Sequence, residues 1–347
     1  MSEGRGAPEG LVRVGAVDCG TNSIRLLVAD IDPVTQTVTD AERRMEIVRL
    51  GQGIDEAGVI APEAMERTLA MTREYAAQCR ALRAARVRFV ATSASRDAGN
   101  ADEFVAGVRA AFIEEWGEPV DPEVISGDEE AALSFAGATG DLRAGGVPGP
   151  YLVVDLGGGS TEFVRGTDRV LAARSVDIGC VRMSERHLLS DPPTASQIAA
   201  ATADIDAAID VAAEAVPIEG VATLVGVAGT VTTIAAHALR LRTYDPVAIH
   251  LSRLPVPQVL EATAELLAMT RAELAALPYM HPGRVDVIGA GALVWSRIIE
   301  RVASVSGVGR VGRVGRVGDV GDVGGVTEVV ASEHDILDGI ARSLVAH

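Results

Sequence analysis

Apolar and polar positions along the chain predict strands first and then alternating helices and strands. Short apolar runs predict strands over residues 11–17, 24–30 and about 41–50. Apolar residues at helical spacing, with Pro62 at a first helical position, predict a helix over 62–82. The pattern continues with a strand over 87–91, a helix over 101–116 and a strand over 123–126. Three consecutive strands followed by alternating elements are typical of an α/β domain.

The same order of elements returns after residues 140–150, a segment rich in Gly and Pro that marks a domain boundary. Strands are expected over 151–155, 161–165, 170–177, 221–227 and 326–330, with helices over about 231–301 and over 335–345. We therefore predict an N-terminal domain over 1–139 and a C-terminal domain over 140–334. Residues 307–325 repeat a Val-Gly-Arg/Asp triplet, which predicts a flexible surface insertion.

A repeated motif follows the first strand of each block. DCGTNSIR begins at Asp18 and DLGGGSTE begins at Asp155, and both lie between apolar runs. The offset of 137 residues (155 − 18) exceeds any solenoid period, so we interpret it as a duplicated domain. Each copy reads as strand, Gly-rich turn and strand. Two such turns facing one another across a cleft would offer their backbone N–H groups to a phosphate chain.

A structural interpretation of the two turns stays open. Tight turns use Gly for positive φ, and Asp and Ser side chains in them bond to their own backbone. The duplication favours phosphate binding instead. The candidates for phosphate contact in the turns are Gly20, Thr21, Asn22, Ser23, Arg25, Gly157, Gly158, Gly159, Ser160 and Thr161.

Composition and charge exclude several function classes. The chain has no lysine, so neither Gly-rich turn is a Walker-type loop, which requires Gly-Lys. The net charge of −17 argues against a nucleic-acid-binding surface, which requires a basic footprint. A polyanionic substrate is compatible with it, because a few arginines and a divalent cation reverse the potential locally.

The localisation expected from the sequence is cytoplasmic. No apolar run approaches the roughly 20 residues that span a bilayer, and the N-terminus has no apolar signal core. The three cysteines show no paired or metal-ligand spacing, so we expect them to be reduced.

Carboxylates at the turns are candidate metal ligands. Asp155 and Glu162 bracket the second turn, and hard oxygen ligands of this kind suit Mg²⁺. Asp18 occupies the position of Asp155 in the first copy, so we group it with them. The alternative for Glu162 is a surface ion pair with an arginine.

Residues 125–131 supply a candidate general base. Ser126 and Glu129 match a helix capping box, which leaves Glu130 free near the helix start. A carboxylate within reach of a water acts as a general base; the alternative is a solvated glutamate favoured by the helix dipole. Arg96, in an expected strand-to-helix loop, is a candidate for bidentate phosphate contact. Asn100 with Glu103 reads as a helix N-cap with a supporting glutamate.

With these motifs assembled, the chain resembles the exopolyphosphatase/guanosine pentaphosphate phosphohydrolase family, in particular its short actinobacterial exopolyphosphatases. The resemblance is carried by VGAVDCGTNSIRLLVAD, VRLGQGID, VATSASRDAGN, VISGDEEAALSF, VVDLGGGSTEFV, VDIGCVRMSERHL, GVAGTVTT, AIHLSR, MHPGRVDVIGAGA and SEHDILDGIA, in this order. It implies an α/β protein of two RNase H-like domains, of the actin-like ATPase superfamily, with an interdomain cleft.

The resemblance also implies roles for the candidates. Glu130 matches the catalytic base, Asp155 and Glu162 match carboxylates that serve the metal and the attacking water, and Arg96 matches a phosphate-contacting arginine. The two turns match the phosphate-binding loops. The family's last helix packs on the first domain, which assigns residues 335–347 to it. Many relatives carry an arginine near Leu337 or Asp338, which this chain lacks, and the chain has no room for the further helical domain of larger members.

The hypothesis from the sequence is Mg²⁺-assisted release of terminal phosphate from inorganic polyphosphate by water. The alternative substrate is guanosine pentaphosphate, cleaved to the tetraphosphate, which would place the protein in the stringent response. An ATP-dependent kinase of the same fold and a non-catalytic polyphosphate or nucleotide sensor are the alternatives from other classes. We expect no nucleic-acid or membrane partner, and a homodimer is left open.

Overall fold

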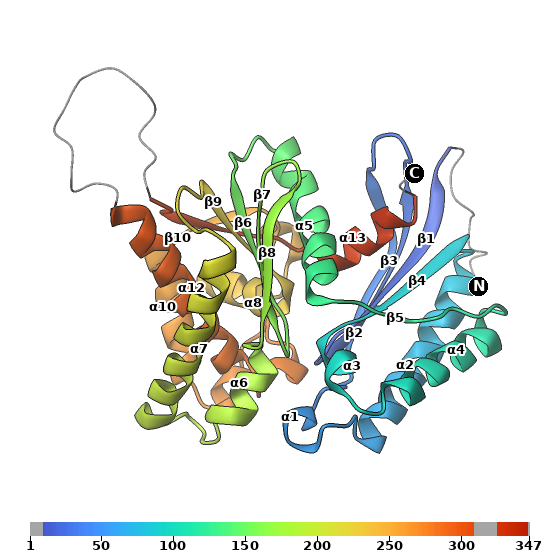
Figure 1. Cartoon of the computed structure of the whole chain (residues 1–347), viewed down its shortest axis with the longest axis horizontal. Coiled ribbons are helices and arrows are strands. Elements are labelled where there is room, and N and C mark those ends of the chain that lie inside the picture. Colours follow the sequence, from blue (N-terminus) through green and yellow to red (C-terminus); the bar gives the residue numbers. More distant parts are fainter. Residues whose placement is uncertain (1–9, 309–324, 346–347) are drawn as a thin grey trace. The chain divides into compact units, whose positions relative to one another are not determined.

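The structure is a computed structural model that describes residues 10–308 and 325–345. It divides into two compact units, coloured by sequence in Figure 1. The first unit takes in the described residues up to Gly137 and again from His334 onward, and the second unit runs from Ala138 to Glu333. Each unit is built on its own mixed sheet.

The sheet of the first unit has the strand order β3-β2-β1-β4-β5. Its strands are β1 (Val12–Cys19), β2 (Ser23–Ile31), β3 (Val38–Ile47), β4 (Arg86–Ala91) and β5 (Glu123–Val124). β1, β2 and β3 form an antiparallel meander, whereas β4 pairs parallel to β1 and β5 parallel to β4. The ends of β1 and β4 therefore lie at the same edge of the sheet.

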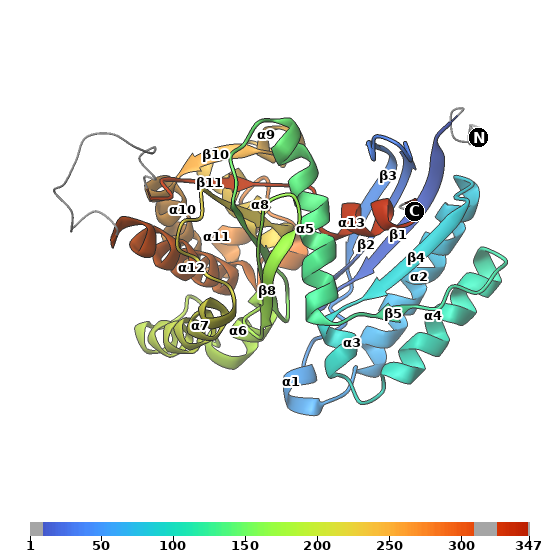
Figure 2. The ribbon, with the colours of Figure 1, turned by 45° about the horizontal axis from the view of Figure 1, so that its top comes forward.

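Helices cover both faces of this sheet, as Figure 2 shows. α2 (Pro62–Ala81) and α4 (Ala101–Glu115) pack on one face, in a core with Val17 and Leu26. α13 (Ile336–Ser343) packs on the other face, against Ala16 and Leu27. Because side chains alternate along a strand, Asp18 of β1 and Arg25 of β2 belong to the α13 face. The side chains at the base of the first Gly-rich turn therefore lie on the face that α13 covers.

Two glycines let α13 approach α5 (Gly127–Ala144) backbone to backbone. A Cβ atom on Gly137 would lie 1.7 Å from the carbonyl oxygen of Asp335. A Cβ atom on Gly339 would lie 2.0 Å from the carbonyl oxygen of Leu133. Any larger residue at either position would push the two helices apart, so the N-terminus of α13 is fixed within the first unit.

The sheet of the second unit repeats this topology, with one added strand in the order β10-β11-β9-β6-β7-β8. Its strands are β6 (Tyr151–Leu156), β7 (Thr161–Gly166), β8 (Val170–Val176), β9 (Thr223–Val227), β10 (Ser252–Pro255) and β11 (Glu328–Ala331). The meander β6-β7-β8 corresponds to β1-β2-β3, and the parallel strands β9 and β11 correspond to β4 and β5. β10 is an antiparallel addition at the edge.

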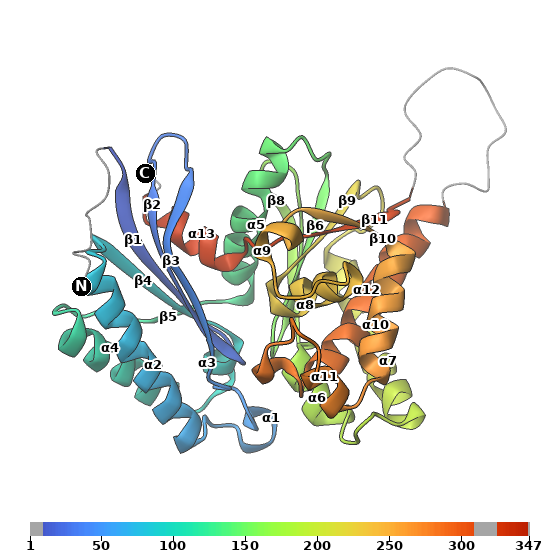
Figure 3. The ribbon, with the colours of Figure 1, turned by 180° about the vertical axis from the view of Figure 1, so that it is seen from behind.

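Helices of the second unit form one large apolar core on this sheet, seen from behind in Figure 3. They are α6 (Cys180–His187), α7 (Ala195–Ala215), α8 (Ala228–Ala238), α9 (Pro246–Ile249), α10 (Val256–Ala268), α11 (Arg271–Ala275) and α12 (Ile288–Val308). The 3₁₀ turn η1 (Pro282–Arg284) precedes α12 and contributes no buried residue. Trp295 of α12 is fully buried at the centre. A Cβ atom on Gly226 of β9 would lie only 2.7 Å from the Trp295 ring, so glycine leaves the room that this ring needs.

The predicted α/β class is confirmed, with two mixed sheets of the same RNase H-like strand order. The predicted helix over 62–82 is α2, one residue shorter. The triplet segment 307–325 lies outside the described residues, apart from 307–308 at the end of α12 and residue 325. Among the described helices, none combines the length and apolar character that crossing a membrane requires.

Some local features differ from the predictions. The helices α1 (Ile54–Ala57) and α3 (Ser93–Asp97) were not predicted, and Arg96 lies in α3 rather than in a loop. Asn100 stands at the N-cap of α4, but its side chain makes no cap hydrogen bond. Its amide group instead accepts from the N–H of Ile60 at 2.8 Å and donates to the carbonyl of Ile60 at 3.1 Å. Asn100 thus connects the start of α4 to the backbone at Ile60, and both the oxygen and the NH₂ group of its amide are hydrogen-bonded.

Candidate functional site

The two repeated turns are hairpins with the same closing hydrogen bond. The N–H of Gly20 donates to the carbonyl of Ser23 at 2.9 Å, and the N–H of Gly157 donates to the carbonyl of Ser160 at 3.1 Å. Each hairpin therefore has a two-residue loop. Neither Gly20 nor Gly157 has a left-handed φ. The structural alternative, that glycine is there to supply a positive φ, is wrong at both positions.

In the second hairpin the carbonyl groups are bound and the amide groups are not. The carbonyls of its three glycines accept hydrogen bonds from residues 179–182. The contacts are Cys180 N to Gly157 O at 3.0 Å, Val181 N and Arg182 N to Gly158 O at 2.9 and 3.2 Å, and Gly179 N to Gly159 O at 3.0 Å. The N–H groups of Gly158, Gly159 and Ser160 donate to no protein acceptor among the described residues. Successive amides of this kind form an anion-binding concavity.

Gly179 is the residue that permits this packing. A Cβ atom there would lie 2.2 Å from both the carbonyl carbon and the carbonyl oxygen of Gly158. The backbone of Gly179 is otherwise ordinary, with φ −76° and ψ 161°. Glycine is therefore required by the close approach of two backbones and not by conformation. The sequence analysis missed this role, although the motif VDIGC contains the residue.

The first hairpin shows the same division between carbonyls and amides. The carbonyl of Thr21 accepts from the N–H of Gly51 at 2.9 Å, and that of Asn22 accepts from residues 48 and 49 at 3.1 and 2.9 Å. The N–H groups of Thr21 and Asn22 donate to no acceptor within the described part of the chain. The Thr21 hydroxyl lies 2.9 Å from that of Ser93, which connects the loop to the start of α3.

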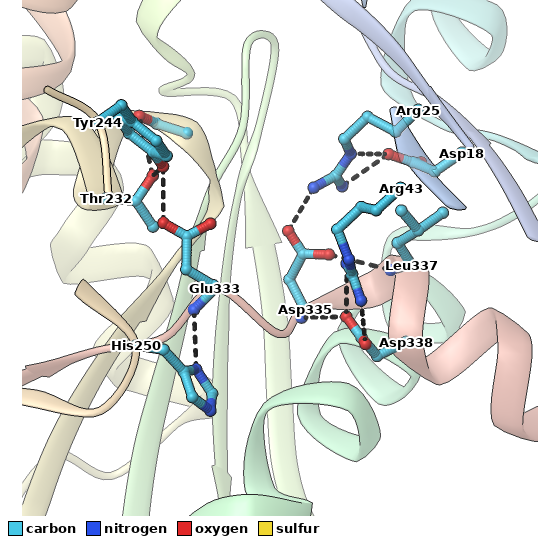
Figure 4. Close-up of polar contacts among 11 residues, drawn as sticks. Asp18, Arg25, Arg43, Thr232, Tyr244, His250, Glu333, Asp335, Leu337 and Asp338 are labelled. Carbon is cyan, nitrogen blue, oxygen red and sulfur yellow. Dashed lines mark hydrogen bonds and ion pairs between the residues drawn. The ribbon is translucent and has the colours of Figure 1, made fainter. Parts of the chain in front are cut away.

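At the base of the first hairpin, Asp18 pairs with Arg25 directly across the strands. Arg25 donates from Nε and Nη2 to one oxygen of Asp18, Oδ2, at 2.9 and 2.7 Å, and from Nη1 to Asp335, as Figure 4 shows. The other oxygen, Oδ1, is buried and has no hydrogen-bond partner among the described residues. Burial raises the pKa of Asp18, and the charge of Arg25 opposes this rise. An orphaned buried carboxylate oxygen is suited to a cation or a water.

At the same register position of the second hairpin, Asp155 lies opposite Glu162. Both carboxylates are buried, with 5% and 1% exposure. The Ser175 hydroxyl, on the next strand, donates to Oε1 of Glu162 at 2.7 Å. Like charges directly across a strand pair destabilise a sheet, whereas two hard oxygen ligands suit a divalent cation. The donor set therefore fits a divalent cation.

Glu130, the candidate base, lies in the first turn of α5 and is 8% exposed. Its Oε2 accepts from Nη1 of Arg96 at 2.7 Å, and the same nitrogen donates to the carbonyl of Ile125 at 2.9 Å. Burial raises the pKa of Glu130, while the Arg96 charge and hydrogen bond lower it. The expectation of a free Glu130 was wrong, because Arg96 pairs with it.

The predicted capping box is only half formed. The N–H of Glu129 donates to the Ser126 hydroxyl at 3.2 Å. The Glu129 carboxylate does not return to the cap and pairs instead with Arg88 at 2.9 Å, on the surface. The two adjacent glutamates thus differ sharply, since Glu129 is exposed and Glu130 is buried.

The first unit brings its predicted residues together. The charges of both Asp18 and Arg25 act on Glu130, the first raising and the second lowering its pKa. Asp335 joins this group through Arg25. Sequence analysis assigned Asp335 only to the terminal helix, and its spacing from the other residues carried no signal of the contact.

Comparisons with known proteins agree with this arrangement. Residues 27–307 match the model of the Ppx/GppA phosphatase family. Exopolyphosphatase 2 of Mycobacterium tuberculosis is 46% identical over 336 residues, which cover 96% of this chain and 99% of that protein. A crystal structure of an exopolyphosphatase-like protein superimposes with a TM-score of 0.87 at 42% identity, over 97% of this chain and 98% of the other.

A second activity appears among the relatives. A guanosine-5'-triphosphate,3'-diphosphate pyrophosphatase of Vibrio cholerae is 37% identical over 183 residues, covering 52% of this chain and 34% of that protein. Exopolyphosphatase 2 and the family model each match most of the chain, whereas this relative matches about half of it. The chain belongs to the Ppx/GppA phosphatase family.

Proposed function

We propose that the protein is an exopolyphosphatase, which releases terminal orthophosphate from inorganic polyphosphate by attack of water. The observation that carries this proposal is the pair of hairpins whose loop carbonyls accept hydrogen bonds from the protein, while their loop amides find no acceptor in the part of the chain that the structure describes. Phosphoryl transfer depends on positioning and charge stabilisation more than on covalent chemistry. Backbone amides provide both for an anionic chain without requiring lysine, which this chain lacks.

The roles of the side chains follow from their surroundings. The N–H groups of the two loops bind phosphate oxygens, with the hydroxyls of Thr21 and Ser160 beside them. Asp155 and Glu162 would hold Mg²⁺, and Oδ1 of Asp18 would offer a further oxygen to a cation or to water. Bound Mg²⁺ would neutralise charge on the phosphate oxygens.

Glu130 accepts the proton of the attacking water. Burial raises the pKa of Glu130, which makes it a stronger base than an exposed glutamate, while the charge and hydrogen bond of Arg96 favour its ionised form. Arg96 holds the carboxylate in one orientation through its second contact, with the carbonyl of Ile125. We propose that Arg96 also contacts phosphate, through guanidinium nitrogens other than Nη1.

The alternative substrate is guanosine pentaphosphate, which the name of the Vibrio cholerae relative supports. It would be cleaved by the same groups, because it also ends in a phosphoric anhydride. Action in the cytoplasm, and in the stringent response for this second substrate, belongs to the proposal.

Glu130→Gln tests the mechanism. We expect kcat for phosphate release from long-chain polyphosphate to fall about 10²–10⁴-fold, the usual contribution of a general base. Phosphate is measured by malachite green at saturating Mg²⁺. Glu129→Gln is the matched control, because this adjacent carboxylate is exposed and pairs with Arg88. Near-normal turnover by Glu130→Gln would remove this residue from the mechanism.

A substrate panel tests the activity itself. Wild-type protein is assayed with long polyphosphate, short polyphosphate and guanosine pentaphosphate in parallel. The proposal predicts the highest kcat/KM for a polyphosphate. Higher kcat/KM for the nucleotide would favour the alternative, and tight binding without phosphate release would indicate a sensor.

A further inference from the structure

The N-terminus of α13 places a buried carboxylate against the guanidinium that holds Asp18. Asp335 is 3% exposed and accepts from Nη1 of Arg25. Its Oδ1 accepts from the N–H of Leu337 at 3.0 Å, as the N-cap of the helix. Figure 4 shows Asp335 and Asp18 on either side of the Arg25 guanidinium. The close approach of α13 to α5 at Gly137 fixes the Asp335 backbone in this place.

The pairing between Arg25 and Asp18 has an unusual form. An arginine and a carboxylate commonly form two parallel bonds, one to each carboxylate oxygen. Here Nε and Nη2 both bond to Oδ2 of Asp18, and Oδ1 is left without a partner among the described residues. The remaining terminal nitrogen, Nη1, is taken by Asp335. The second carboxylate thus holds the guanidinium in a position from which it reaches only one oxygen of Asp18.

We propose that Asp335 is a positioning residue for the hydrolase reaction, which acts through Arg25. It keeps the guanidinium on Oδ2 of Asp18 and so preserves Oδ1 for water or a cation. Without Asp335, Arg25 is free to turn and to bond both oxygens of Asp18. This inference rests on the proposed function, and it assigns to Arg25 a structural role in addition to the expected contact with phosphate.

A neighbouring ion pair on the same helix provides a matched control. Asp338 is fully buried in the first turn of α13 and accepts from Arg43 of β3, at 2.6 Å to Nη2. Arg43 lies opposite Leu27 in the sheet, and so on the same face as Arg25. This pair resembles the Asp335–Arg25 pair in charge, burial and helix position. Among the described residues, neither side chain of this pair bonds to Asp18. Asp338 also accepts from the N–H of Asp335 at 3.2 Å, as the other half of the capping box, and asparagine keeps an oxygen acceptor for that bond.

The test compares Asp335→Asn with Asp338→Asn. Asparagine keeps the N-cap acceptor at position 335 but presents an amide NH₂ or a single oxygen where Oδ2 stood. We expect kcat for Asp335→Asn to fall about 10–100-fold, the usual cost of removing a group that orients a ligand or a catalytic side chain. KM should change less than about twofold, because the hairpin amides are intact. Asp338→Asn should retain both constants per folded molecule.

A second readout does not depend on turnover. The dissociation constant for Mn²⁺, measured by electron paramagnetic resonance without substrate, should rise about tenfold in Asp335→Asn and stay unchanged in Asp338→Asn. Circular dichroism confirms folding, and Arg43→Gln replaces Asp338→Asn if that variant does not fold. Asp335→Ser, which also keeps an N-cap, is the substitute at the tested position.

Equal kcat and equal Mn²⁺ affinity in Asp335→Asn and the control would overturn the inference and leave Asp335 as a helix cap. If the wild type releases no phosphate from polyphosphate, the proposed function fails on its own. The Mn²⁺ comparison then decides the positioning role alone.

Discussion

The hairpins of the two units share their backbone but differ at one register position. Both close with the same hydrogen bond, and both have their carbonyls bound by a following segment that contains a glycine, Gly51 in the first unit and Gly179 in the second. At the base of the loop, the first unit has Asp18 opposite Arg25, whereas the second has Asp155 opposite Glu162. The two units thus share the hydrogen bonding of the loop backbone, while the side chains at its base differ.

The divergence separates two tasks. In the first unit, an opposite-charge pair lies near Glu130, whose own charge is balanced by Arg96. In the second unit, two buried carboxylates stand opposite one another, an arrangement suited to a divalent cation. We infer that the first unit supplies the base and one further oxygen, Oδ1 of Asp18, and that the second unit supplies the paired metal ligands. The predictions below test this division.

The largest effect is expected from removing a carboxylate of the second unit. Asp155→Asn or Glu162→Gln should lower kcat about 10²–10³-fold, because a bound cation contributes several kcal/mol to phosphoryl transfer. The Mg²⁺ concentration for half-maximal activity should also rise. Phosphate release measured over a Mg²⁺ titration checks both effects.

The control is Asp168→Asn, which removes an exposed carboxylate from the turn between β7 and β8. It should leave activity and Mg²⁺ dependence unchanged. If Glu162→Gln loses activity with an unaltered Mg²⁺ requirement, Glu162 does not hold the metal, and the proposed division between the units is wrong.

A smaller and unequal effect is expected from the glycines that bind the loop carbonyls. In Gly179→Ala the added carbon meets the Gly158 backbone at 2.2 Å, so the loop must shift. In Gly51→Ala it meets the Thr21 side chain at 2.3 Å, which has more freedom to move. We expect kcat/KM to fall about 10²-fold for Gly179→Ala, as for a displacement near 1 Å, and about tenfold or less for Gly51→Ala.

Gly20→Ala is the control for this pair. Its Cβ atom would have ordinary contacts, the nearest being 3.6 Å from the Ser23 carbonyl oxygen. Activity within about threefold of wild type is expected, since an ordinary contact requires no displacement. Thermal unfolding of the variants separates loop displacement from loss of folded protein. Equal losses for Gly179→Ala and Gly51→Ala would show that the two loops tolerate displacement equally.

The sequence predicted the fold well because its signals are local. Short apolar runs predicted both meanders, and the repeated DxG motif predicted the repeated topology of the two units. β10 was missed because it is four residues long and ends in Pro255, and α3 because five residues are too few to show a helical period.

The site was predicted less completely, because its contacts join distant segments. Glu130 was selected from a capping-box pattern, but its pairing with Arg96 depends on how α3 and α5 meet. Asn100 was read as a cap on local grounds, and tertiary structure gave it Ile60 as partner. The division between bound carbonyls and unbound amides is a property of backbone packing, which residue types do not encode directly.

The smallest effect, a change in pH dependence, tests the charge balance that only the first unit has. Burial raises the pKa of Glu130, and Arg96 opposes that rise. The base acts when ionised, so kcat/KM falls as pH drops through this pKa. Arg96→Gln removes the opposing charge and should move the acidic limb of the kcat/KM profile to higher pH. Arg88→Gln, which affects Glu129 on the surface, should not move it.

The free energy of unfolding should also depend on the protonation of Glu130, in a direction that follows from its raised pKa. Because the folded pKa of Glu130 is raised, the folded state binds its proton more tightly than the unfolded state. This contribution to stability is complete below the unfolded pKa and is lost as pH rises through the folded pKa. Glu130→Gln should therefore flatten the dependence of unfolding free energy on pH in that window, measured by urea denaturation. An unchanged slope would mean that burial does not raise the pKa of Glu130. The inferred difference between the two units would then lack its base.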